Sequence, residues 1–155
     1  MRLTNFSDYA LRMLMYAASA GDRLITIEET ARVYGLSKAH LNKVANTLTR
    51  AGYLKAVRGR SGGLMLGRDP EAIRVGDVIR LTEPDFALVE CFATGNQCVL
   101  TGSCKLTGVL NEAAASFHAT LDRYTLADIA LERVDFLGGA VPARPRQKEV
   151  VAAGP

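Results

Sequence analysis

The stretch TIEETARVYGLSKAHLNKVANTLTRAG, residues 26–52, predicts two short helices joined by a tight turn. Thr26 followed by Glu29 is a capping-box pattern that begins the first helix. Gly35 ends it, because glycine adopts the left-handed conformation that a sharp bend requires. Ser37 can cap the second helix, whose apolar residues recur at helical spacing: Leu41, Val44, Ala45 and Leu48. The pattern indicates a helix–turn–helix, with a generic helical hairpin as the alternative.

The polar side of the second predicted helix differs from that of a solvated helix. A solvated helix alternates glutamate and lysine, whereas this one has no acidic residue and mixes basic side chains with amides. Basic side chains pair with phosphates and amides bind base edges, so we expect this helix to enter the major groove of duplex DNA. Its expected DNA contacts are Lys38, His40, Asn42, Lys43 and Asn46.

A glycine-rich segment follows the second helix and predicts a β-wing. Residues 53–57 and 64–66 are short runs with strand character, joined by the turn RGRSGG. Arg58 and Arg60 lie at its tip, where arginines can reach phosphates or a narrow minor groove. The glycines do not belong to a nucleotide-binding loop, because the GxxxxGK[ST] motif and the strand–glycine–helix order are both missing from the sequence.

The distribution of charge also favours a polyanionic partner. Residues 1–80 carry 13 Lys/Arg and 7 Asp/Glu, a net charge of +6, whereas residues 81–155 carry 6 and 9, a net charge of −3. Between Glu29 and Asp69 there are eight basic residues and no acidic one. Such a one-sided stretch is typical of phosphate binding, although RNA or a membrane surface would attract it as well.

All three cysteines, Cys91, Cys98 and Cys104, lie within 14 residues. Three thiols cannot pair completely in disulfides, which favours a reduced intracellular site over a secreted scaffold. The C-x6-C-x5-C spacing is wider than that of most zinc sites, so a loop that wraps an iron–sulfur cluster is plausible. The alternatives are three unrelated core residues, or a thiol switch in which two of the cysteines form a disulfide.

Several other classes of protein fit the sequence poorly. No Ser/His/Asp, paired-carboxylate or nucleotide-binding motif supports an enzyme. A role in electron transfer or cluster assembly would explain the thiols but not the basic stretch and the wing. No apolar run approaches the length of a membrane span, and Asp8 and Arg12 interrupt the segment that could resemble a signal peptide. We therefore expect a cytoplasmic protein that does not bind membranes and whose first segment is a helix.

A long apolar stripe lies beyond the cysteines. From residue 106 to residue 124, apolar side chains recur every three or four positions, which predicts a helix of roughly five turns. A long alanine-rich helix beside a small domain commonly packs against its twin, giving the homodimer that reads two DNA half-sites. An intramolecular core helix is the alternative. The expected dimer contacts are Leu110, Ala113, Phe117 and Leu121.

Together these patterns predict a mainly α-helical fold with a small β-wing: a winged helix–turn–helix domain and a long dimerisation helix. The predicted division has four parts. They are a DNA-binding domain at 1–80, a cluster-binding loop region at 81–105, the dimerisation helix with a short C-terminal helix at 106–137, and a disordered tail at 138–155.

Three features occur in an order that resembles the IscR-like winged-helix regulators, the Rrf-type family. They are the run VRGRSGGLMLG at 57–67, the run IRVGDV at 73–78 and the cysteines that follow. Within that family, MRLTNFSDYALR at 1–12, RAGYL at 50–54 and YTLAD at 124–128 are similar to nitric-oxide-sensing repressors. The resemblance covers about residues 1–135.

The resemblance implies a cytoplasmic homodimer that represses nitric-oxide detoxification genes. Such repressors leave their operator DNA when a [4Fe–4S] cluster reacts with nitric oxide. It also implies that the three cysteines and Asp8 of the partner subunit hold the cluster. The nearest alternative is a redox- or iron-sensing relative with a [2Fe–2S] cluster.

The fourth ligand has other candidates. Where IscR-type relatives place a histidine, three residues after the last cysteine, this chain has Thr107. Glu90 and His118 are the fallback ligands. Asp8 also has an ordinary role to fill, because an acidic residue in the first turn of a helix favours the helix dipole and can pair with Arg12 one turn later.

Overall fold

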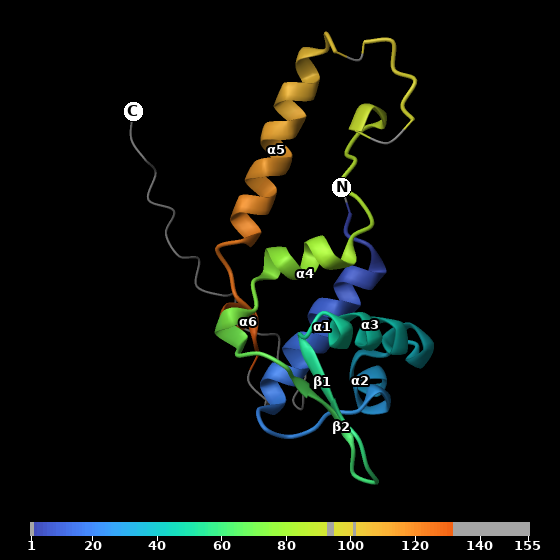
Figure 1. Cartoon of the computed structure of the whole chain (residues 1–155), viewed down its shortest axis with the longest axis vertical. Coiled ribbons are helices and arrows are strands. Elements are labelled where there is room, and N and C mark those ends of the chain that lie inside the picture. Colours follow the sequence, from blue (N-terminus) through green and yellow to red (C-terminus); the bar gives the residue numbers. More distant parts are fainter. Residues whose placement is uncertain (1, 93–94, 101, 132–155) are drawn as a thin grey trace.

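The computed structural model describes residues 2–92, 95–100 and 102–131, so the predicted tail at 138–155 lies outside the described residues. The elements in chain order are α1 (Asn5–Ala20), α2 (Ile27–Tyr34), α3 (Lys38–Arg50), β1 (Leu54–Val57), β2 (Gly63–Leu66), η1 (Pro70–Ala72), α4 (Val75–Thr82), η2 (Glu90–Phe92), α5 (Lys105–Leu121) and α6 (Leu126–Ile129). Helices α1 to α4 and the hairpin form one body, from which α5 projects on the side away from the hairpin tip (Figure 1). The predicted mainly helical fold with a small β-wing is confirmed.

The helix–turn–helix begins and ends where the sequence predicts. The hydroxyl oxygen of Thr26 accepts the backbone N–H of Glu29 at 3.0 Å, which caps α2. Gly35 ends α2 in the left-handed conformation with φ of 63°. Ser37 precedes α3 as predicted, but its side chain makes no capping hydrogen bond.

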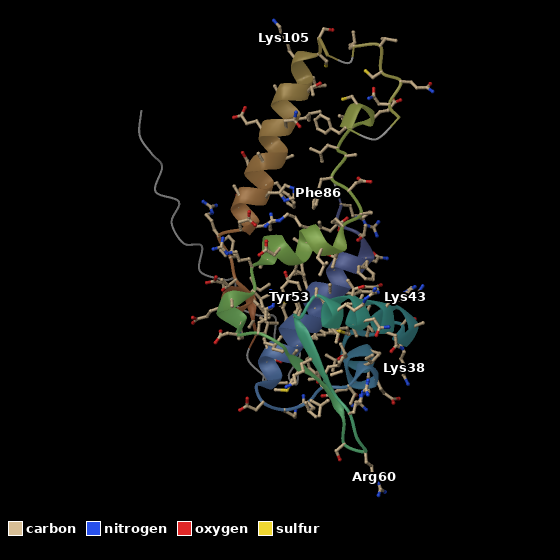
Figure 2. All side chains as sticks on the ribbon, viewed as in Figure 1. Lys38, Lys43, Tyr53, Arg60, Phe86 and Lys105 are labelled. Carbon is tan, nitrogen blue, oxygen red and sulfur yellow. The ribbon has the colours of Figure 1, made fainter. Side chains whose placement is uncertain are left out.

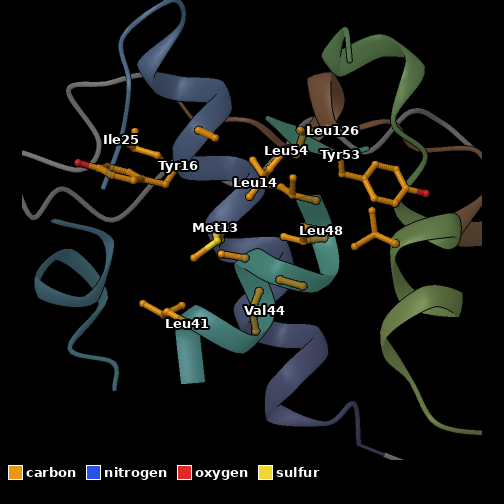
Figure 3. Close-up of a cluster of buried hydrophobic side chains, with 14 of the residues drawn as sticks. Met13, Leu14, Tyr16, Ile25, Leu41, Val44, Leu48, Tyr53, Leu54 and Leu126 are labelled. Carbon is orange, nitrogen blue, oxygen red and sulfur yellow. The ribbon is translucent and has the colours of Figure 1, made fainter. Parts of the chain in front are cut away.

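One apolar cluster joins the helices of the body (Figure 3). The four apolar residues predicted for α3 are all buried, and they pack with Met13 and Leu14 of α1. Leu126 of α6 enters the same cluster, although the whole of α5 lies between it and the other buried residues of the cluster in the sequence. Helix α1 contacts both α3 and α4, and α4 contacts α5, so α1 and α4 connect α3 to the base of α5.

The hairpin is fixed at its root. Strands β1 and β2 pair antiparallel, with Leu54 opposite Leu66. Leu64 also exchanges two backbone hydrogen bonds of 2.8 and 2.9 Å with Ile25, just before α2. A Cβ atom at Gly63 would overlap the carbonyl oxygen of Ile25, so this approach requires glycine. The wing therefore keeps a defined position relative to the helix–turn–helix.

Helix α5 is the long helix that the sequence predicts, and none of its 17 residues, all in the described part of the chain, is buried. Phe86, in the segment between α4 and η2, lies beside α5 (Figure 2). The centres of the Phe86 and His118 rings are 4.3 Å apart. The helix ends at Leu121, so Tyr124 is not part of it, contrary to the predicted stripe. Tyr124 instead accepts a backbone hydrogen bond of 2.9 Å from Val75.

Candidate nucleic-acid interface and cysteine loop

The side chains predicted to read DNA lie on the exposed side of α3. The structure leaves all five exposed: Lys38, His40, Asn42, Lys43 and Asn46. They occupy the side opposite the buried residues that hold α3 on the core. Lys43 projects from α3 and Lys38 from its first turn, while Arg60 lies at the far end of the wing (Figure 2).

Two of the five already have neighbours within the subunit. The ammonium group of Lys38 lies 2.7 Å from Oε1 of Glu28, and this hydrogen bond lowers the pKa of the Glu28 carboxyl. The His40 ring lies 6.3 Å from that of Tyr9. The side chains of Asn42, Lys43 and Asn46 make no hydrogen bond or ion pair with the described residues. Exposed ion pairs are weak, so a phosphate can replace Glu28 as the partner of Lys38.

The arginines of the basic stretch have two different roles. Arg58 and Arg60 are exposed on the turn of the wing. Arg68 instead donates a 2.7 Å hydrogen bond to the carbonyl oxygen of Ala51, and its guanidinium lies 4.6 Å from the centre of the Tyr53 ring. Arg68 therefore links the chain just after β2 to the chain just after α3. The charge pattern alone did not indicate this structural role.

Replacing Arg58 by alanine is expected to weaken operator binding. If Arg58 contacts phosphate alone, the slope of log affinity against log salt should fall by about one unit. Titration of a labelled operator at several salt concentrations measures this slope. Arg123→Ala is the matched control, because Arg123 is an exposed arginine beyond α5. Unchanged affinity and slope in Arg58→Ala would remove the wing from the interface.

Asn42→Ala should behave differently, because an amide that reads a base edge acts on one sequence only. We expect a loss of about 1–3 kcal/mol on the cognate operator and little change on random duplex DNA. Competition between the cognate operator and random duplex DNA measures the ratio of the two affinities. An equal loss on both would show that Asn42 contacts the backbone.

The three cysteines occupy one loop at the end of α5 distant from the DNA-binding body (Figure 1). All three are partly buried and none is in a disulfide. In the part of the chain that the structure describes, no three His, Cys, Asp or Glu side chains gather closely enough to hold one metal ion. The structure thus places the thiols on one loop without bringing them to a common point.

The donor chemistry of this loop fits an iron–sulfur cluster. Cys104 is the N-cap of α5, where the backbone and side chain of Thr107 and the backbone of Leu106 lower the pKa of its thiol. None of these contacts has the geometry of a full capping hydrogen bond. Because the thiolate is the form that binds iron, the lowered pKa of Cys104 favours binding, and a loop with three cysteines suits a soft metal cluster.

In this structure Asp8 forms the ion pair with Arg12 that its place in the first turn of α1 predicts. Its two carboxylate oxygens accept from the Arg12 guanidinium at 3.0 and 2.9 Å, one turn along α1. Both side chains are partly exposed, so the pair is accessible to a second subunit. Asp8 remains a predicted ligand, and ligation would require it to leave Arg12.

The two fallback ligands lie in different places. Glu90 is exposed beside Cys91 and accepts a hydrogen bond of 3.3 Å from the backbone of Gln97 across the loop. His118 is 14 residues beyond Cys104, about 21 Å along the axis of α5. Its Nδ1 is buried with no hydrogen-bond partner in the described chain. His118 therefore lies far from Cys104 of its own subunit.

An exposed basic helix held beside a wing with arginines at its tip defines a winged helix–turn–helix protein that binds DNA. The model of one family, Rrf2, described as an iron-dependent transcriptional regulator, matches residues 3–132. The chain belongs to the Rrf2 family. No helix among the described residues is both long enough and apolar enough to cross a membrane.

Individual relatives agree with this assignment. The HTH-type transcriptional regulator NsrR of Bacillus subtilis (strain 168) is 47% identical over 139 residues, covering 88% of this chain and 95% of the relative. The solved structure of CymR, the global cysteine regulator of B. subtilis, matches with a TM-score of 0.71 at 27% identity, covering 84% of this chain and 96% of that one. The IscR of T. potens matches with a TM-score of 0.68 at 26% identity, covering 93% of each chain. The family and NsrR are transcriptional regulators, which confirms both the resemblance and the prediction that the chain is not an enzyme.

Proposed function

We propose that the protein is a cytoplasmic homodimeric repressor that senses nitric oxide and releases the operators of nitric-oxide detoxification genes. A [4Fe–4S] cluster would be held by Cys91, Cys98, Cys104 and Asp8 of the partner subunit. The observation that carries the proposal is the loop of three thiols, one with a lowered pKa, on a DNA-binding chain that is similar to NsrR over 88% of its length.

The exposed apolar side of α5 supports the homodimer. Leu106 and Val109 are 57% and 62% exposed, and Ala113 continues the same side of the helix. A 17-residue helix with no buried residue gains little stabilisation from its own subunit, so we infer that a second copy covers its exposed apolar side. Pairing through α5 would place two DNA-binding bodies in one molecule, as reading two half-sites requires.

The residues around Asp8 suggest how a change at the cluster would affect the position of the DNA-binding helices. When bound, the cluster supplies iron that reacts with nitric oxide. Asp8 would offer an oxygen ligand, which binds iron more weakly than a thiolate does. Its present partner Arg12 lies 5.8 Å from the Tyr34 ring centre, and the Tyr34 hydroxyl donates to the carbonyl oxygen of Arg12 at 3.1 Å. A move of Asp8 between iron and Arg12 would thus alter the contacts that Arg12 makes with Tyr34, the last residue of α2.

Anaerobic purification followed by an absorption spectrum, with iron and sulfide counts, tests the proposal. Operator affinity is then measured before and after addition of nitric oxide. The proposal expects a four-iron cluster and a loss of affinity on addition of the gas. A two-iron cluster would favour a redox- or iron-sensing relative, and a metal-free protein that responds to oxidants would favour the thiol switch.

Asp8→Ala is expected to be milder than loss of a cysteine. Water or a buffer thiol can occupy the vacated position, so the variant should assemble a cluster that is lost faster and controls DNA affinity less well. The measurements are cluster content over time and operator affinity with and without nitric oxide.

Arg12→Ala is the matched control for Asp8→Ala. It breaks the same ion pair but keeps the carboxylate, so it should retain a stable cluster. If both variants lose the cluster equally, the ion pair matters and ligation does not. If Asp8→Ala keeps wild-type cluster stability and full release by nitric oxide, Glu90 or His118 becomes the better ligand.

A further inference from the structure

The chain returns to the DNA-binding body immediately after α5. The backbone of Val75 donates to Tyr124 at 2.9 Å, and the backbone of Leu126 donates to Ile73 at 2.7 Å. The Leu126 side chain is buried in the core. This joint between α5 and the body lies beside α4, so the direction of α5 depends on how residues 122–126 meet α4.

Arg80 of α4 bridges two carboxylates at this joint. Its guanidinium donates two hydrogen bonds of 2.6 and 3.2 Å to the two oxygens of Asp122, the residue that follows α5. It also lies 2.6 Å from Oδ1 of Asp77. The hydrogen bond from Arg80 lowers the pKa of the Asp122 carboxyl, so this ion pair is charged at neutral pH. A planar guanidinium held from two sides has one orientation, which a lysine ammonium group would not share.

Gly76 makes room for the same carboxylate. A Cβ atom at Gly76 would overlap Oδ1 of Asp122 and would lie 3.3 Å from Nη1 of Arg80. The end of α5 therefore sits directly against the first turn of α4. Two independent features, a bidentate ion pair and a glycine contact, fix one position of Asp122 on α4.

The helix on which α5 ends also packs near the end of α3. Tyr53, three residues beyond α3, belongs to the same buried cluster as Val78 of α4. The Arg68 guanidinium, just after β2, lies 4.6 Å from the centre of the Tyr53 ring. Through Tyr53, α4 is thus connected to the end of α3 and to the root of the wing.

We propose that Arg80 is a positioning residue that sets the spacing of operator half-sites. The proposal rests on the dimer through α5 proposed above. In such a dimer the separation of the two α3 helices depends on the angle between α5 and its own body. Half-sites one turn apart lie about 34 Å from each other, so a small change of angle moves α3 out of its groove.

This role concerns geometry more than stability. The side chains of Arg80 and Asp122 are 40% and 33% exposed, and exposed ion pairs contribute little to the free energy of unfolding. Arg80→Gln should therefore melt close to the wild-type temperature. What it should lose is the single orientation of α5, which allows the two bodies to adopt several separations.

The test compares operators that differ only in half-site spacing. A palindromic operator is first selected from random duplexes with the cluster-loaded wild-type protein, and one base pair is then inserted or removed at its centre. This changes the separation of the half-sites by about 3.4 Å and their relative rotation about the DNA axis by about 34°. The wild type should lose about tenfold or more in affinity, whereas Arg80→Gln should lose about twofold or less. On the original operator, Arg80→Gln should bind several-fold more weakly than the wild type.

Two further variants make the result decisive. Gly76→Ala should reproduce the relaxed spacing without removing a charge, and it decides the question if Arg80→Gln does not fold. Arg123→Gln removes an exposed arginine next to Asp122 and should keep wild-type discrimination. Wild-type discrimination in Arg80→Gln or, if it does not fold, in Gly76→Ala would overturn the role of Arg80. A wild type that is monomeric or indifferent to spacing would instead contradict the proposed dimer.

Discussion

Replacing Cys98 by alanine is expected to reduce the iron and sulfide content of the anaerobically purified protein to background. Two thiolates and one carboxylate hold iron poorly, and the loop loses the ligand between its two ends. The variant should also lose its response to nitric oxide, because no iron remains to react. The measurements are the visible absorption spectrum, metal and sulfide analysis, and operator affinity with and without the gas.

Val99→Ala is the control for this experiment. Val99 is the next residue and is 94% exposed, so its truncation tests whether the loop tolerates a neighbouring change. It should keep the cluster and the response. If Cys98→Ala retained wild-type iron and sulfide, Cys98 would not be a ligand. If the wild type contained no iron and Cys98→Ala lost only a response to oxidants, the thiol switch would be the better account.

Ala113→Asp is expected to separate the subunits and thereby abolish high-affinity operator binding. Ala113 lies on the exposed apolar side of α5, and a two-fold interface would bury two of the new carboxylates without a partner. We expect the dimer dissociation constant to rise about a hundredfold or more. Sedimentation measures the change, and circular dichroism verifies that the variant remains helical.

Ala115→Asp provides a matched control on the same helix. Both alanines are exposed in the single subunit, and two residues correspond to about 200° around the helix axis. The two substitutions have the same intrinsic cost in helix propensity, so only the side of the helix differs. Ala115→Asp should remain dimeric. A folded, dimeric Ala113→Asp would show that this side of α5 is not the interface.

The DNA-binding elements could be predicted from the sequence because their signals are local. Thr26 and Gly35 mark the two ends of α2, and the apolar spacing that begins at Leu41 identifies the buried side of α3. The arginines of the wing stand out because glycines surround them. Each signal spans a few residues, so no long-range contact was needed to interpret it.

The joint at the base of α5 could not be predicted in this way. Arg80 and Asp122 are 42 residues apart, and each resembles an ordinary surface charge in its own segment. The helix ends before Tyr124 because the chain turns back to the core, which the apolar stripe did not indicate. The cysteines show a related limit, since their spacing indicates the chemistry of the ligands but not where the sulfurs meet.

The return of the chain after α5 makes residues 83–121 an insertion into the DNA-binding unit. The insertion leaves from one end of α4 and comes back at Asp122 beside the same helix, which is about 12 Å long. Leu126 then completes the core that α1 and α3 began. Because both ends of the insertion are anchored on one short helix, its length and its cysteine ligands can diverge without repacking that core. Evolution can therefore change the thiol ligands of such a regulator by altering one contiguous segment of the gene, while Asp8 stays in α1.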